Sequence, residues 1–190
     1  MSTAPSIRAY RSEHDRRAPP RSPRRDSAAR SGVALVLFLV IAYGVAAFGS
    51  LSTIDNVDGW YAGAEKVAWN PPNVLFGPVW TVLYALMSIA AWLVWRRREL
   101  PGAKAALGWY VAQLALNAIW TPVFFGAYPL IGGAALWIAS GIIVALDVAV
   151  VITMLRFARI RPVAAWLLAP YLVWILYATT LSFGLAVLNG

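Results

Sequence analysis

The sequence contains no cysteine, and its single histidine, His14, lies near the N-terminus. The rest of the chain therefore has no disulfide, no thiolate nucleophile and no metal site built from Cys or His. Charged residues are also scarce, at 13% of 190 residues, which is about half the share of a soluble domain. Together with 61% hydrophobic residues, these deficits predict an all-α membrane protein that requires no metal or cofactor.

The positions of the basic residues decide whether the net charge of +8 indicates nucleic acid or membrane as the partner. Eight of the sixteen lie in the first 31 residues, and Lys66 stands alone in a later loop. The others occupy two short connections between apolar runs: Arg96, Arg97, Arg98 and Lys104, and then Arg156, Arg159 and Arg161. Basic residues in alternate connections follow the positive-inside rule. The sequence predicts membrane lipid and no nucleic acid as a partner, with the N-terminus in the cytoplasm and the C-terminus outside.

Five apolar segments are long enough to cross a bilayer at about 1.5 Å per residue. They are residues 33–51, 76–95, 105–125, 132–155 and 163–188. A cleaved signal peptide is the alternative for the first, but its basic region is too long and its apolar run too extended. We therefore predict a bundle of five transmembrane helices at residues 32–190, in the cell membrane. It follows a disordered Arg- and Pro-rich tail at residues 1–31, and Pro170 should kink the fifth helix.

Three of the predicted helices carry aromatic and polar side chains at helical spacing, which places them on one stripe of each helix. The stripes are Trp80, Tyr84 and Met87; Gln113, Asn117, Trp120 and Phe124; and Tyr171, Trp174, Ala178 and Ser182. Two interpretations stay open: the stripes enclose a flat-walled ligand cavity, or they pack against each other. Ten tryptophans are more than interfacial anchoring needs, and this number favours the cavity.

Two further features lie in the fourth predicted span. Asp147 is the one acidic residue within a predicted span, and such a residue is by default a functional candidate. It is either protonated, exposed to a polar crevice, or part of a proton relay. Gly141, Ala145 and Ala149 form a stripe of small residues that permits close approach of another helix. Homodimerisation and packing within the bundle are equal interpretations of this stripe.

Three blocks of sequence between Trp60 and Ser182 resemble the TspO/MBR family of tryptophan-rich sensory and translocator proteins. The first block is WY, K-x-x-W-N-P-P and F-G-P-V-W-T-x-L-Y-x-L-M-S-I-A. The second is Tyr110 with AQLALNAIWTPVFFG, and the third is PYL at 170–172 with Trp174 and ATTL from Ala178. No motif covers the first helix or the tail.

The resemblance implies a five-helix bundle, usually a homodimer, whose cavity binds porphyrins, sterols and synthetic isoquinoline or benzodiazepine ligands. Carried over position by position, the ligand-lining residues are Trp69, Trp80, Tyr84, Asn117, Trp120, Phe124, Trp174 and Ala178. The family pattern K-P-x-W is altered to Lys66-Val67-Ala68-Trp69, so the loop lacks a rigid proline. The sterol motif expected in the last helix is absent, since Phe183 and Val187 replace its tyrosine and basic residue.

The resemblance favours a regulatory or stress-sensing membrane protein that binds tetrapyrroles such as porphyrin or haem. Without histidine or cysteine in the bundle, haem iron would lack its usual axial ligand. Two alternatives are a light-dependent breakdown of bound porphyrin with tryptophan as reactant, and transport coupled to Asp147. The five spans do not divide into the repeats of secondary carriers. No conventional catalytic residues are predicted.

Overall fold

The computed structural model describes residues 23–190, with side chains from residue 28 onward, and this part of the chain is helical without strands. Its long segments are α2 (Pro23–Asp58), α4 (Phe76–Trp95), α5 (Ala103–Gly126), α7 (Gly133–Ile160) and the pair α8 (Pro162–Leu167) and α9 (Ala169–Asn189). Short elements lie between them: α3 (Trp60–Gly63), the 3₁₀ turn η2 (Asn73–Leu75) and α6 (Tyr128–Ile131). The all-helical prediction is confirmed.

Four helical stretches are long and apolar enough to cross a membrane: residues 28–58, 73–95, 133–160 and 162–189. They correspond to the first, second, fourth and fifth predicted spans. The third predicted span is α5, which is not among them because it carries Gln113 and Asn117 in its middle. Helix α5 is nevertheless 24 residues long, or about 36 Å, so its length suffices.

The observed boundaries differ from the predicted ones mainly at the first helix. Helix α2 begins at Pro23, ahead of the predicted start at residue 33, and ends at Asp58. Residues 23–31 of the predicted disordered tail are therefore helical, because adding residues to an existing helix is far easier than starting one. Residues 1–22 lie outside the described residues. The helix stops before Gly59, where a Cβ would lie 2.7 Å from the carbonyl oxygen of Asp55.

Glycine and proline set the other boundaries. Gly102 (φ 84°) and Gly132 (φ 61°) precede α5 and α7 in backbone conformations that favour glycine. The predicted kink near Pro170 appears as a break at Leu168 between α8 and α9, since Pro170 cannot donate a backbone hydrogen bond. Helix α5 continues through Pro122 to Gly126.

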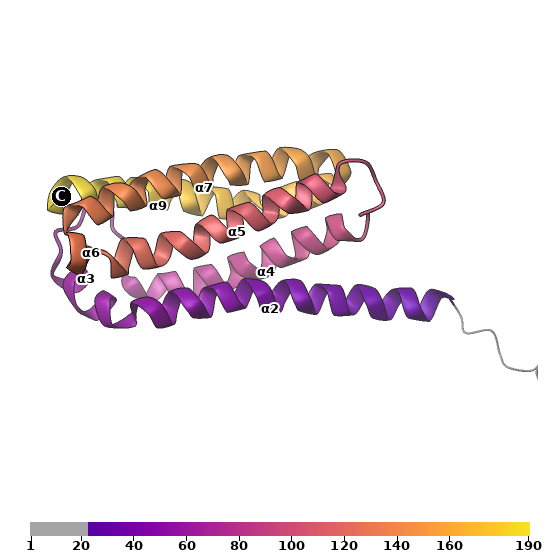
Figure 1. Ribbon diagram of the computed structural model, residues 1–190, viewed down its shortest axis with the longest axis horizontal. Coiled ribbons are helices and arrows are strands. Elements are labelled where there is room, and N and C mark those ends of the chain that lie inside the picture. The colour runs from indigo at the N-terminus through magenta and orange to yellow at the C-terminus, as the bar shows by residue number, and fades with distance from the viewer. Residues whose placement is uncertain (1–22) are drawn as a thin grey trace, which may run out of the picture. The chain divides into compact units, whose positions relative to one another are not determined.

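The core of residues 34–190 lies where α7 packs against α5 and α9 (Figure 1), and where α8 packs against α4. Small residues such as Ala90, Ala106 and Ala164 are fully buried there and allow the helices to approach closely. Helix α2 is peripheral. Of the residues in its most apolar segment 17% are buried, against 44% for α7. Its backbone makes few close contacts with the other helices.

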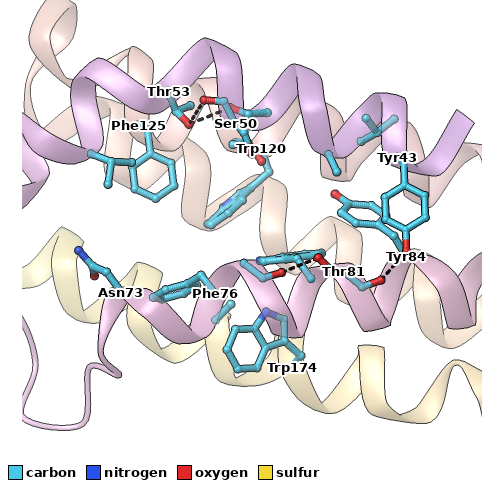
Figure 2. Close-up of a pocket in the computed structure, with 18 of the residues that line it drawn as sticks. Tyr43, Ser50, Thr53, Asn73, Phe76, Thr81, Tyr84, Trp120, Phe125 and Trp174 are labelled. Atoms are coloured by element: carbon cyan, nitrogen blue, oxygen red, sulfur yellow. Dashed lines mark hydrogen bonds between the residues drawn. The ribbon is translucent and has the colours of Figure 1, made fainter. Parts of the chain in front are cut away.

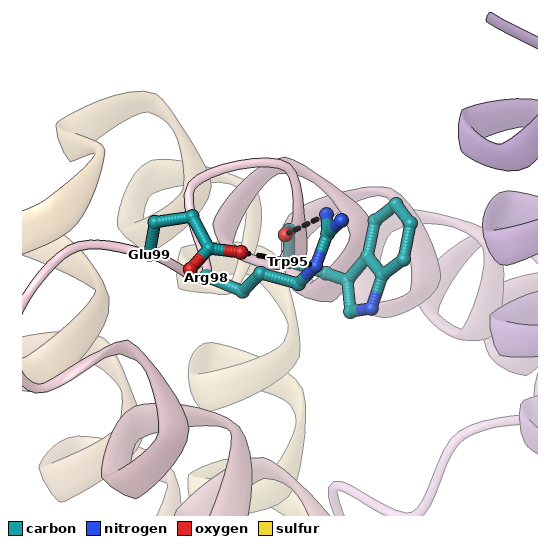
Figure 3. A network of polar contacts seen from close by, with 3 residues as sticks. All are labelled: Trp95, Arg98 and Glu99. Atoms are coloured by element: carbon teal, nitrogen blue, oxygen red, sulfur yellow. Dashed lines mark hydrogen bonds and ion pairs between the residues drawn. The ribbon is translucent and has the colours of Figure 1, made fainter. Parts of the chain in front are cut away.

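The turn between α4 and α5 carries a cluster of basic residues. Figure 3 shows Arg98 folded back over the ring of Trp95, 4.1 Å from the ring centroid. The Arg98 guanidinium donates to the carbonyl oxygen of Trp95 at 3.3 Å and lies 3.7 Å from Glu99. Such exposed contacts hold the arginine close to the helix end but add little to stability.

Candidate functional site

A cavity of about 360 Å³ lies between α2 and α4, with α5 and α9 forming its inner wall (Figure 2). This volume is within the range of small-molecule sites, about 300–1,000 Å³. Its lining residues are Tyr43, Val45, Ala46, Gly49, Ser50, Thr53, Val57, Tyr61, Asn73, Phe76, Gly77, Trp80, Thr81, Tyr84, Trp120, Thr121, Phe125, Trp174 and Ala178.

Aromatic rings from α4 form one wall of the cavity. Trp80 stacks on Tyr84 with a centroid distance of 5.3 Å and an interplanar angle of 30°. Phe76 meets Trp174 of α9 edge to face at 5.8 Å. Phe76, Trp80 and Tyr84 lie on one stripe of α4 because they are spaced four residues apart. The wall therefore offers flat apolar faces, and such faces suit a planar ligand.

Helix α2 forms the opposite wall, which sequence analysis did not predict. Tyr43, Ala46, Ser50, Thr53 and Val57 recur at three- or four-residue spacing and all line the cavity. The sequence feature that could have indicated this wall is a set of small residues on one stripe of a helix whose other apolar residues are bulky. None of the three sequence blocks that resemble the family lies in α2, and this signal alone does not distinguish a cavity wall from a packing face.

Five of the eight predicted ligand-lining residues lie at the cavity: Trp80, Tyr84, Trp120, Trp174 and Ala178. They come from α4, α5 and α9, so the three predicted stripes do converge. Figure 2 shows Trp120, Tyr84 and Trp174 around the same space. The structure thus brings these five residues together, and their contact with a ligand stays a prediction.

Asn117 does not line the cavity but lies directly behind its wall. The Tyr84 hydroxyl donates to Asn117 Oδ1 at 2.7 Å, and Asn117 Nδ2 donates to the Tyr171 hydroxyl at 3.2 Å. All three side chains are buried. Asn117 is therefore absent from the lining of this cavity, because its amide is bonded to two tyrosines, and its contact with a ligand stays a prediction. Its role here is to fix the position of Tyr84.

Phe124 and Trp69 also lie outside the cavity lining. Phe124 is buried in a second aromatic cluster, where it stacks on Trp120 at 5.0 Å and contacts Tyr61 at 6.3 Å. It supports Trp120 from behind. Trp69 lies on the loop between α3 and α4 and is 56% exposed. Its indole N–H donates to the Thr180 hydroxyl at 3.2 Å, and its contact with a ligand stays a prediction.

The loop between α2 and α4 is fastened to the bundle at several points. The Trp60 indole N–H donates to the Phe125 carbonyl oxygen at 2.7 Å. The backbone of Glu65 exchanges two hydrogen bonds with the Asn189 amide, at 3.0 and 2.9 Å. The Tyr177 hydroxyl donates to the carbonyl oxygen of Trp69 at 2.6 Å. The loop therefore closes this end of the bundle.

Lys66 and Tyr61 contact each other within the same loop. The Lys66 ammonium donates to the carbonyl oxygen of Tyr61 at 2.7 Å and lies 4.8 Å from the Tyr61 ring centroid. Burial raises the pKa of Tyr61, and the hydrogen bond that its hydroxyl donates to Asn70 acts in the opposite direction. Tyr61 thus stays a neutral phenol at neutral pH.

The cavity has hydrogen-bonding groups but no charged lining residue. Thr53 donates to the Gly49 carbonyl oxygen at 2.7 Å, so its hydroxyl oxygen keeps lone pairs for a ligand donor. The Trp120 indole nitrogen is buried and has no partner among the described residues. Among the described residues, the site can therefore orient a neutral polar group and offers no charged side chain to an ionic one.

No cluster of three or more His, Cys, Asp or Glu side chains occurs in the described part of the chain. Asp147 is buried in the contact between α7 and α9, where the Thr179 hydroxyl donates to Oδ2 at 2.8 Å. The other oxygen, Oδ1, has no partner among the residues described. Asp147 is not a lining residue of the cavity.

The small-residue stripe on α7 is partly covered. Gly141 and Ala145 are exposed, with open space around the Cα atom of Gly141. Ala149 is 3% exposed, so it packs within the bundle. Only the first two residues of the predicted stripe are therefore available to a second helix.

Comparison with known proteins agrees with the sequence motifs. A sequence model of the TspO/MBR family matches residues 36–188. The chain is similar to the tryptophan-rich protein TspO of Archaeoglobus fulgidus, with 38% identity over 81% of this chain and 94% of the relative. It is 43% identical to the human translocator protein over 65% of this chain and 71% of that protein. It is also 38% identical to the tryptophan-rich sensory protein of Cereibacter sphaeroides, over 80% and 91% of the two chains.

Proposed function

This chain belongs to the TspO/MBR family of integral membrane proteins, and on that basis we propose that it binds tetrapyrroles within the bilayer as a sensor. The observation that carries the proposal is the uncharged cavity with Trp80 and Tyr84 stacked along one wall. Ring faces of this kind attract a planar aromatic ligand by about 0.5–1.5 kcal/mol per ring pair beyond the area buried.

The cavity chemistry favours metal-free porphyrin over haem. No His, Cys or Met of the described residues lines it, and the hydroxyls of its three tyrosines already donate hydrogen bonds, Tyr43 to Thr81, Tyr61 to Asn70 and Tyr84 to Asn117. Haem iron would therefore lack its usual axial ligand. No Lys or Arg lines the cavity either, so the porphyrin carboxylates must lie outside it, because an unpaired buried carboxylate costs several kcal/mol.

The membrane arrangement follows from the same helices. We propose that α5 also crosses the membrane, as the third of five spans, because it is long enough and its polar residues Gln113 and Asn117 are buried in the bundle. The basic turns then lie in the cytoplasm and the C-terminus outside the cell membrane. The exposed Gly141 and Ala145 on α7 are the proposed homodimer contact.

Light-dependent porphyrin breakdown is a second candidate, favoured by one observation. Three indoles, those of Trp80, Trp120 and Trp174, line the cavity next to any bound ligand. Illumination of the porphyrin complex tests it: a new chromophore absent from free porphyrin supports turnover, and bleaching at the rate of free porphyrin contradicts it. Transport coupled to Asp147 has less support, because Asp147 does not line the cavity.

The test of binding is a titration of the detergent-purified protein with protoporphyrin IX, followed by the shift in porphyrin absorbance. Trp80→Phe should weaken binding by about tenfold, the loss of roughly one ring contact. Trp166→Phe is the matched control, because Trp166 is 76% exposed and does not line the cavity. Unsaturable association, or equal effects of both substitutions, would contradict the proposed site.

A further inference from the structure

We propose that this cavity is loaded sideways from the bilayer, through a slot between α2 and α4 that the Tyr43–Thr81 hydrogen bond closes. The slot is defined by the exposed lining residues Tyr43, Ser50, Asn73, Gly77 and Thr81. The inference rests on the proposed binding function and adds to it the route of entry and the class of ligand, a membrane-dissolved amphiphile.

The exposure of the lining residues locates the slot. All five exposed members belong to α2, α4 or the η2 turn just before α4. The members contributed by α5 and α9 are buried or half-buried, and Ala178 on α9 is only 8% exposed. The cavity is therefore closed on its α5 and α9 sides and open between α2 and α4.

The slot reaches far into the hydrocarbon layer. Tyr43 is at the centre of the apolar stretch 28–58, about 22 Å from either end. Thr81 is eight residues from the start of the stretch 73–95, or about 12 Å. The hydrogen bond between the Tyr43 hydroxyl and the Thr81 carbonyl oxygen, at 2.9 Å, thus lies at membrane depth (Figure 2). Asn73 marks the opposite end of the slot, near the membrane surface.

A ligand could reach the cavity under the loop between α2 and α4 or through the slot, and the loop is held by more hydrogen bonds than the slot. The loop at the water-facing end is held by Trp60, Glu65 and Trp69 through hydrogen bonds to α5 and α9. At the slot, the Tyr43 hydroxyl joins α2 to α4, and outside the cavity lining the Ser88 hydroxyl donates to the Phe38 carbonyl oxygen of α2 at 3.2 Å. Helix α2 is also the least buried of the four apolar stretches. Parting α2 from α4 therefore breaks fewer interactions than lifting the loop.

The chemistry of the slot defines the ligand. Its deep end offers the rings of Trp80 and Tyr84, and its surface end offers the polar side chains of Ser50 and Asn73. A flat apolar body can lie against the rings while a polar or charged end stays at the headgroup level, because a charge deep in the slot would remain unpaired. Amphiphiles that dissolve in the bilayer have this form.

The absence of cysteine permits a clean test, because introduced thiols have no competitors. The slot pair Tyr43→Cys/Thr81→Cys and the loop pair Glu65→Cys/Asn189→Cys are each reconstituted in phosphatidylcholine vesicles. Each is measured before and after closure with a short thiol cross-linker. The readout is the association rate of protoporphyrin IX delivered from loaded vesicles, so each variant is its own control.

Cross-linking the slot pair should slow association by at least about tenfold, and cross-linking the loop pair should change it by less than about twofold. Tyr43→Phe in the otherwise unchanged protein should speed association by about fivefold, the factor that corresponds to a net hydrogen bond of about 1 kcal/mol. The reverse pattern, or equal slowing by both cross-links, would overturn entry through the slot.

Failure of porphyrin binding in the unmodified protein would refute the proposed function separately. The slot is then tested through Ala46→Cys, a half-buried lining residue of α2. A maleimide dissolved in the bilayer should react with this thiol much faster than a charged, membrane-impermeant maleimide of equal reactivity in solution. Equal labelling by the two reagents would mean that the cavity opens to water and would overturn the inference.

Discussion

Replacement of Asn117 by alanine should weaken porphyrin binding through Tyr84 and not through loss of a ligand contact. Asn117 is 2% exposed, lies behind the cavity wall, and bonds the hydroxyls of Tyr84 and Tyr171. The substitution removes two hydrogen bonds and leaves two buried hydroxyls without their partner. At about 1–2 kcal/mol for each, the free energy of unfolding should fall by about 2–4 kcal/mol.

A double-mutant cycle with Tyr84→Phe separates the two explanations. If Asn117 acts by holding Tyr84, then Asn117→Ala should change the porphyrin Kd by less than about twofold once Tyr84 has lost its hydroxyl. The stability effects of the two substitutions should fall short of additivity by about 1 kcal/mol. Porphyrin titration and denaturant unfolding in detergent measure both quantities. Equal loss of affinity in both backgrounds would refute the positioning role.

Gln113 provides the control on the same helix. It is one turn before Asn117 and is 1% exposed, but neither polar atom of its side chain has a partner among the described residues. Gln113→Leu removes a buried, unsatisfied amide at similar volume. The substitution should therefore leave stability unchanged or raise it by about 1–2 kcal/mol, in contrast to Asn117→Ala.

Two other predictions address α2 and Asp147. Ala46→Leu should lower porphyrin affinity by at least about tenfold by filling the cavity from α2, whereas Ala47→Leu, at the adjacent exposed position outside the lining, should change it by less than about twofold. A titration in which both variants bind alike would remove α2 from the site. Asp147→Asn should keep the Thr179 hydrogen bond, leave porphyrin affinity unchanged and stabilise the protein by about 1 kcal/mol, measured by denaturant unfolding, because it removes an ionisable group from the bundle. A loss of binding would instead connect Asp147 to the cavity.

Much of the fold could be predicted because apolar run length and basic clusters are strong signals. The second predicted span, residues 76–95, coincides with α4. The first span was drawn too short because hydropathy shows where a helix is apolar and not where it ends. Helix α2 continues into polar sequence at both ends and stops at Asp58, just before Gly59, where a Cβ would lie 2.7 Å from the Asp55 carbonyl oxygen.

The candidate site was predictable only in part, since a stripe specifies a face of a helix and not the depth of each side chain. Trp80, Trp120 and Trp174 lie on stripes that meet at the cavity. Asn117 lies on the same stripe as Trp120, one turn away, but its short amide is captured by two tyrosines before it reaches the cavity. Spacing in the sequence does not contain that information.

The wall formed by α2 was not predicted because the two sides of a cavity need residues of different size. A planar ligand needs large rings on one side, and these are conspicuous in a sequence as Trp80 and Tyr84. The facing side must leave room, so it needs small residues such as Ala46, Gly49 and Ser50. Gly49 also lets α2 approach α5 closely, because a Cβ there would lie 3.2 Å from Thr121. Large aromatic residues therefore reveal one wall in the sequence, whereas the small residues of the other wall do not stand out.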